Sequence, residues 1–125
     1  MEAYIEHQAD VVVGEANNGG DLVETVIRQQ MPLINYKKVH ATKNKYTRAE
    51  PVSALMHLKP SKHHIIGELP ELELEMTEWE GKSGDASPNR IDAMVWGAFE
   101  LMPDLNPQRN VMQGSFAKAL RGNLR

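Results

Sequence analysis

The apolar and polar positions of the first forty residues alternate between strand-like and helix-like segments. Residues 10–14 are a short β-branched run closed by a glycine, which is typical of a buried strand. Residues 36–42 predict a second strand. A helix is expected between them, from about Asp21 as N-cap, with Glu24 in capping-box position, to just before Pro32. Its predicted apolar stripe is Leu22, Val23, Val26 and Ile27.

Helical periods dominate the rest of the chain. Thr47 and Glu50 have capping-box spacing and predict a helix that ends before Pro60, after which residues 64–66 form a short strand or an extended connection. Residues 69–79 carry apolar positions at helical spacing, and Ser87 is expected to cap a last helix. The apolar face of that last helix is expected to comprise Ile91, Val95, Ala98, Phe99 and Met102.

This order predicts an α/β fold in which helices flank a thin, mostly parallel sheet of two or three strands. The 125 residues suffice for one domain, which we expect over residues 1–103, followed by a polar and basic tail over 104–125. The chain has no cysteine, which excludes disulfides and thiolate metal sites. No apolar run is long enough to span a membrane and no secretion signal is evident, so we expect a cytoplasmic protein.

Charge is unevenly distributed, although the net charge is only −3. A basic stretch over residues 37–48 precedes an acidic block over residues 68–80, and the tail is basic again. The basic stretch is compatible with a DNA-facing side, but a solvated surface is the commoner explanation of such a stretch.

Two carboxylates are candidates for chemistry. Glu15 ends an apolar strand, where α/β folds place functional groups, although a glutamate there can also simply face water. Asp92 lies in the first turn of the last predicted helix, where it could instead only stabilise the helix dipole. Brought together, two such carboxylates suit a divalent cation that prefers oxygen ligands, and a third would be expected.

Other candidate sites are weaker. His57, His63 and His64 lack zinc-ligand spacing and have no cysteine beside them. Residues 17–20 form a turn that opens a helix, where backbone amides can hold phosphate, but no Walker lysine follows and a plain turn explains the pattern.

Three ordered segments together resemble the nuclease domain of the tailed-phage terminase large subunit. Residues 9–23 (ADVVVGEANNGGDLV) are similar to its second acidic motif, residues 45–52 (KYTRAEPV) to its Lys-x-x-Arg-Ala-x-Pro segment, and residues 87–96 (SPNRIDAMVW) to its third acidic motif. The resemblance runs from about residue 3 to 102.

The resemblance implies a ribonuclease H-like fold and a site of acidic residues that binds Mg²⁺ or Mn²⁺, in the two-metal manner. By position, Glu15 corresponds to the second acid and Asp92 to the third, and both are expected to be catalytic and metal-ligating. The DNA contacts that it implies are Asn17, Lys45 and Arg48, and Asp85 is an auxiliary candidate.

The family's first acid would lie on a strand upstream of Met1, so the chain is expected to be truncated at its N-terminus. The edge of the strand over residues 11–15 would then lack its neighbour, which predicts self-association. The implied role is metal-dependent cleavage of double-stranded DNA during genome packaging in a bacterial host, with the small terminase subunit and portal as partners. Two alternatives stay open: a degenerate, non-catalytic DNA- or partner-binding module, and a transposase or resolvase fragment.

Overall fold

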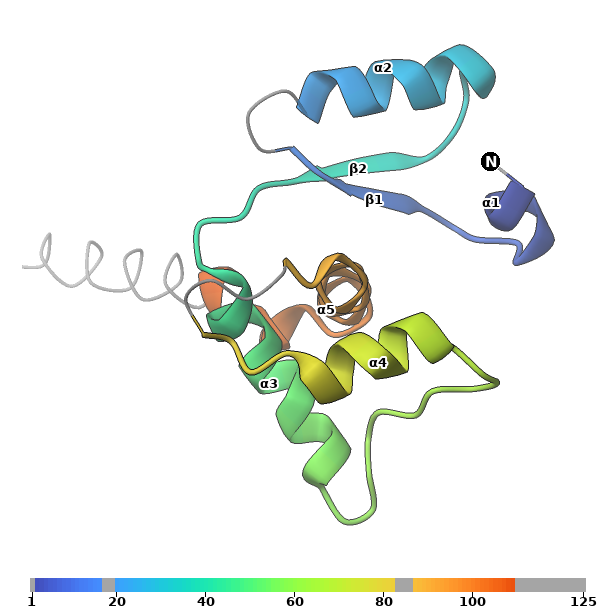
Figure 1. The fold of residues 1–125 in the computed structure, drawn as a ribbon. Coiled ribbons are helices and arrows are strands. Elements are labelled where there is room, and N and C mark those ends of the chain that lie inside the picture. Colours follow the sequence, from blue (N-terminus) through green and yellow to red (C-terminus); the bar gives the residue numbers. More distant parts are fainter. Residues whose placement is uncertain (1, 17–19, 83–86, 110–125) are drawn as a thin grey trace, which may run out of the picture. The chain divides into compact units, whose positions relative to one another are not determined.

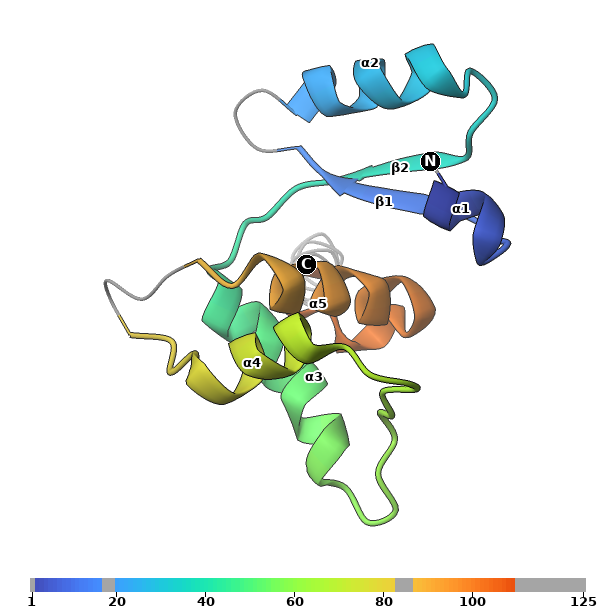
Figure 2. The ribbon, with the colours of Figure 1, turned by 45° about the vertical axis from the view of Figure 1, so that its right-hand side comes forward.

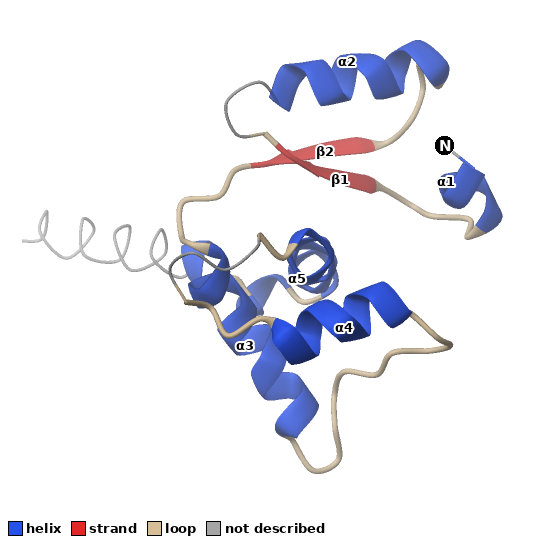
Figure 3. Ribbon diagram, in the orientation of Figure 1, coloured by secondary structure: helices blue, strands red, loops and turns tan. Residues whose placement is uncertain are grey.

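The computed structural model describes residues 2–16, 20–82 and 87–109, and it divides into two compact units, Met1–Thr42 and Lys43–Arg125. Over these described residues the fold is mixed α/β and mostly helical, with six helices and one two-stranded parallel sheet (Figures 1 and 3). The predicted boundary at residue 103 stays a prediction, because residues 110–125 lie outside the described part. None of the helices described is long and apolar enough to cross a membrane.

The first unit is a strand–helix–strand arrangement preceded by one short helix. Its two strands are parallel, with Val12 opposite Tyr36 and Glu15 opposite Val39. The predicted parallel pair is thereby confirmed, and Glu15 is the last residue of its strand, as expected. The elements are α1 (Glu2–Glu6), β1 (Val12–Glu15), α2 (Gly20–Gln30) and β2 (Tyr36–Val39).

Gly14 is required by the side chain of the neighbouring strand. A Cβ atom at this position would overlap the hydroxyl and ring atoms of Tyr36. Any larger residue would therefore displace the Tyr36 ring, which explains why the β-branched run stops one residue before Glu15.

Helix α2 starts differently from the prediction. It begins at Gly20, and the Asp21 carboxylate does not cap it but accepts a 2.6 Å hydrogen bond from the Lys38 ammonium on β2. Lys38 also lies 3.2 Å from Glu24, whose other oxygen accepts from Arg28 at 2.9 Å. The hydrogen bond that Lys38 donates to Asp21 lowers the pKa of Asp21 and raises the pKa of Lys38.

The predicted apolar stripe of α2 is largely exposed. Leu22 is 69% and Val26 46% exposed. Two strands about 5 Å apart make a sheet roughly as wide as a single helix, so they cannot cover a broad apolar face. The sequence predicted correctly which residues form the apolar stripe, but most of the stripe is exposed rather than buried.

The second unit is a helical layer centred on α5 (Asn89–Leu101), which contacts the helices before and after it (Figure 2). Those neighbours are α3 (Lys45–His57), α4 (Pro70–Glu78) and the 3₁₀ helix η1 (Pro103–Leu105). The most deeply buried apolar side chains of this unit are Val52, Ile91, Val95, Trp96 and Phe99.

The sequence placed the apolar face of α5 only partly. Ile91, Val95 and Phe99 are buried as expected, whereas Met102 is 43% exposed and Trp96 is buried in addition. Residues 64–66 form no strand, so of the two forms considered for them the extended connection is correct.

The helices of this unit also begin at residues other than those predicted from the sequence. Asn44, not Thr47, caps α3, because its side-chain oxygen accepts from the Thr47 backbone N–H at 2.8 Å. Pro51 therefore lies inside the helix. Helix α5 begins at Asn89 with Pro88 at the cap position, so Ser87 is one residue too early to cap it.

We predict that the protein self-associates through β1. Within the described residues β1 pairs only with β2, and an unpaired strand edge is a template for another strand. Size-exclusion chromatography with light scattering should give a mass above that of one chain, rising with concentration. A Leu22→Lys variant, which charges the exposed face of α2, should associate equally well. A monodisperse monomer contradicts the prediction, and association lost in Leu22→Lys assigns it to α2.

Candidate functional site

A buried ion pair joins the first turns of α3 and α5. The Arg48 Nη2 atom lies 3.0 Å from Asp92 Oδ1 and 3.2 Å from Oδ2. The Arg48 side chain is 2% exposed and that of Asp92 12%. Two residues 44 positions apart are thereby held together, and the Asp92 carboxylate is fixed in orientation.

Trp96 forms one wall of this site. It lies one helical turn after Asp92, is 7% exposed, and its ring centroid is 4.9 Å from the guanidinium carbon of Arg48. Phe99 packs edge-on against it, with ring centroids 5.8 Å apart at 88°. A cation over an aromatic face is stabilised by about 1–2 kcal/mol where water is excluded, so Trp96 helps Arg48 to stay buried and charged.

Lys45 is a second cation at the same carboxylate. Its ammonium lies 2.6 Å from Ser87 Oγ, 3.1 Å from Asn89 Oδ1 and 3.5 Å from Asp92 Oδ2. It precedes Arg48 by three residues, a spacing that puts both side chains on one face of α3. Unlike Arg48, it is partly exposed, at 29%.

Glu75 of α4 fixes the start of α5. Its Oε2 atom accepts from the backbone N–H groups of Arg90 at 2.9 Å and Ile91 at 3.1 Å, and its Oε1 atom pairs with Arg90 Nη1 at 3.1 Å. These are first-turn amides that a helix cannot satisfy internally. Burial favours the neutral form of Glu75, but the hydrogen bonds from Ile91 and Arg90 outweigh it and lower its pKa. A carboxylate from α4 therefore caps the N-terminus of α5, which is the role that the sequence predicted for Ser87.

The residues predicted from sequence are distributed over both units. Asp92, Lys45 and Arg48 are brought together in the second unit, whereas Glu15 is half-buried at the end of β1 in the first. Asn17 and the auxiliary candidate Asp85 lie outside the described residues. That Glu15 joins Asp92 in one site, and that Arg48 contacts DNA, stay predictions.

No family model matches the chain. No curated protein and no solved structure matches it either. The three sequence motifs and the geometry of the site are therefore the observations that bear on function.

The oxygen atoms around Asp92 are of the type that binds hard cations. The charges around them, however, do not favour another cation. Carboxylate, amide and hydroxyl oxygens are the ligands that Mg²⁺ and Mn²⁺ prefer. Lys45 and Arg48, however, already bring two positive charges to one carboxylate. Nowhere in the described ranges do three or more His, Asp or Glu side chains form a metal-binding group. A metal at Asp92 would need further carboxylates, of which Glu15 is the predicted one.

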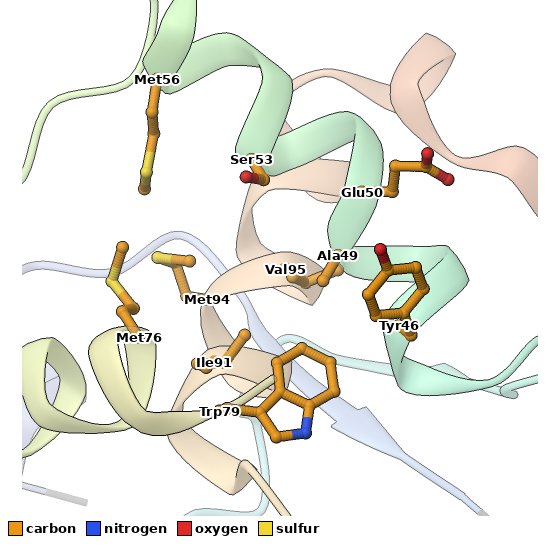
Figure 4. Close-up of a pocket in the computed structure, with 10 residues that line it drawn as sticks. All are labelled: Tyr46, Ala49, Glu50, Ser53, Met56, Met76, Trp79, Ile91, Met94 and Val95. Carbon is orange, nitrogen blue, oxygen red and sulfur yellow. The ribbon is translucent and has the colours of Figure 1, made fainter. Parts of the chain in front are cut away.

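A separate, largely apolar pocket of about 250 Å³ lies among α3, α4 and α5 (Figure 4). Met56, Met76 and Met94 come from the three helices, and Tyr46 and Trp79 pack edge-on at one side. Glu50 is the one carboxylate in its lining. None of the predicted site residues lines it, so this pocket is distinct from the cluster at Asp92.

Sequence reasoning missed four contributors to the site: Glu75, Ser87 and Asn89 as polar partners, and Trp96 as its wall. The role of Glu75 could have been inferred from the sequence, because Glu75 falls among the apolar positions Leu72, Met76 and Trp79 on the inward side of α4. A charged residue at such a position needs a buried partner.

We predict strong energetic coupling between Arg48 and Asp92. Removing one partner of a buried ion pair leaves the other charge uncompensated, so Arg48→Met or Asp92→Ala should each lower the free energy of unfolding by about 3 kcal/mol. The double variant should cost clearly less than the sum of the two. Urea unfolding followed by tryptophan fluorescence measures all four proteins. Additive effects would show that the pair is not coupled, and the more exposed Lys45→Met should cost about 1 kcal/mol or less.

A second prediction concerns pH and Glu75. Because the folded-state pKa of Glu75 lies below the ordinary glutamate value of 4.5, its stabilising contribution is present above about pH 4.5 and is lost as pH falls through the lowered pKa. Glu75→Gln should therefore flatten the acid side of the stability profile between about pH 5 and pH 3. The exposed Glu78→Gln is the matched control. A variant profile parallel to that of the wild type would rule out this role for Glu75.

Proposed function

We propose that this chain is a piece of the nuclease domain of a tailed-phage terminase large subunit, with a ribonuclease H-like fold, that takes part in metal-dependent cleavage of double-stranded DNA during genome packaging. One observation carries the proposal. The segments over residues 45–52 and 87–96, which resemble two separate family motifs, meet through the contacts of Lys45 and Arg48 with Asp92. Motifs that serve one site are expected to converge in space in this way.

The parallel β1–α2–β2 arrangement adds support. Glu15 lies at the carboxyl end of β1, which is the edge of a parallel sheet where α/β proteins gather functional groups. In the proposed site Glu15 and Asp92 would hold Mg²⁺ or Mn²⁺, which supplies stabilisation of the attacking and leaving oxygens of the phosphodiester. The residues of this chain bind and orient: Arg48 fixes the Asp92 carboxylate, and the Trp96 ring lies against the Arg48 guanidinium.

Of the two cations at Asp92, Lys45 is the better suited to a DNA phosphate. Its side chain is 29% exposed, whereas the guanidinium of Arg48 is covered. A lysine offers a flexible point charge that can follow a phosphate. The proposed partners are double-stranded DNA and, within the packaging machinery, the small terminase subunit and portal.

A non-catalytic DNA- or partner-binding module is the second candidate. It is favoured by the charge balance at Asp92, where two cations face one carboxylate, since such a cluster attracts an anion more readily than a metal. In this case the sequence resemblance reflects descent from a nuclease without its activity, and Asp92 serves only to hold Lys45 and Arg48 in place.

A plasmid-nicking assay in Mn²⁺ distinguishes the nuclease proposal from the non-catalytic candidate. The nuclease proposal predicts cleavage that stops with EDTA and falls by about 100-fold or more in Glu15→Gln and in Asp92→Asn, substitutions that keep shape and remove charge. Glu78→Gln, exposed on α4, should cleave as the wild type does. Folding of each variant is checked by circular dichroism.

Absence of cleavage from the folded wild-type protein would contradict the nuclease proposal. DNA binding that survives in that inactive protein would favour the non-catalytic candidate. Cleavage that persists in Glu15→Gln and Asp92→Asn would point to a contaminating nuclease.

A further inference from the structure

The pocket among α3, α4 and α5 has two chemically different ends (Figure 4). At one end the side chains of Met56, Met76 and Met94 point toward one another, each from a different helix. At the other end lie the Tyr46 ring and the Glu50 carboxylate, which are four residues apart and therefore share one face of α3. A ligand that fills this pocket needs an apolar body and a polar head.

We propose that the pocket binds a small organic cation, an amine with an aliphatic chain, whose chain lies among the methionines and whose ammonium lies near Tyr46, Trp79 and Glu50. The proposal goes beyond the proposed function and does not rest on it, because no residue of the Asp92 cluster lines the pocket. The pocket volume of about 250 Å³ is below the roughly 300–1,000 Å³ of sites for drug-sized ligands, which favours a smaller molecule.

The methionine end suits an aliphatic chain. Methionine side chains are unbranched and polarizable, so they adapt to the shape of an apolar ligand. Ile91 and Val95, which are 7% and 1% exposed, complete the apolar lining from α5. Transfer of an aliphatic chain from water to such a surface is favourable in proportion to the apolar area that is buried.

The aromatic end is held in place by its neighbours, although Tyr46 is 55% exposed. Trp79 packs edge-on against the Tyr46 ring, with centroids 6.2 Å apart. Gly81 has a positive φ of 73°, and a Cβ atom at this position would overlap the same ring. The glycine thus lets the backbone pack closely against Tyr46. A cation is attracted both to the face of such a ring and to the exposed Glu50 carboxylate, whereas a neutral head gains neither attraction.

The test compares three probes with the same number of carbon atoms: hexylammonium, hexanol and hexanoate. Each is titrated into protein that is isotope-labelled at its methionine methyl groups, and binding is followed by NMR. Hexylammonium should bind about fivefold more tightly than hexanol, and hexanoate should bind most weakly. The methyl signals of Met56, Met76 and Met94 should shift. Met31 and Met102, which do not line the pocket, serve as internal controls.

Three substitutions locate the binding. Glu50→Gln should weaken hexylammonium binding about threefold and leave hexanol binding unchanged, because it removes the charge and keeps the shape. Glu71→Gln, at an exposed glutamate of α4 outside the pocket, should match the wild type. Ser53→Phe, at an exposed position of α3 that lines the pocket, should fill the space and abolish binding of all the probes.

The proposal is overturned if hexanol or hexanoate binds as tightly as hexylammonium, or if Glu50→Gln does not weaken hexylammonium binding. Shifts at Met31 and Met102 equal to those in the pocket, or no binding to the folded wild-type protein, also overturn it. None of these results bears on the nuclease proposal. Nα-acetyl-lysine amide, whose short chain ends in polar amide groups, should bind more weakly than hexylammonium. Equal binding would assign the pocket to a lysine side chain of a partner protein and would overturn the assignment to a small molecule.

Discussion

The buried ion pair between Arg48 and Asp92 is the interaction on which the second unit depends. Removing two charges from water is costly, and the cost is offset here by the close contact of the two groups and by the Trp96 face beneath the guanidinium. The pair joins the first turns of α3 and α5, so both helices are positioned by the same contact. Val52 and Val95, which are almost fully buried, pack one turn further along each helix and continue that contact as an apolar core.

The same pair limits what Asp92 can do. A carboxylate held by a buried guanidinium has a fixed orientation, which favours metal binding. Its negative charge is already compensated, which opposes metal binding. Lys45 adds a second positive charge beside the same carboxylate.

The sequence predicted local structure well and long-range partners poorly. The β-branched run before Gly14 and the turn after Glu15 sufficed to predict β1, α2 and a parallel β2. The start of α3 was misplaced because Asn44 and Thr47 are both good caps, and only the fold shows that Asn44 accepts from the Thr47 backbone N–H. The cap of α5 could not be read locally, because Glu75 lies on another helix. The burial of Arg48 was hidden for the same reason: arginine is usually exposed, and only the fold shows that Asp92 and Trp96 surround it.

The most direct test of this account is a crystal structure of the protein soaked with Mn²⁺, with the metal located by its anomalous scattering. We predict a peak about 2 Å from an Asp92 carboxylate oxygen and an unchanged contact between Arg48 and Asp92. An anomalous peak elsewhere, with none at Asp92, would contradict this proposal.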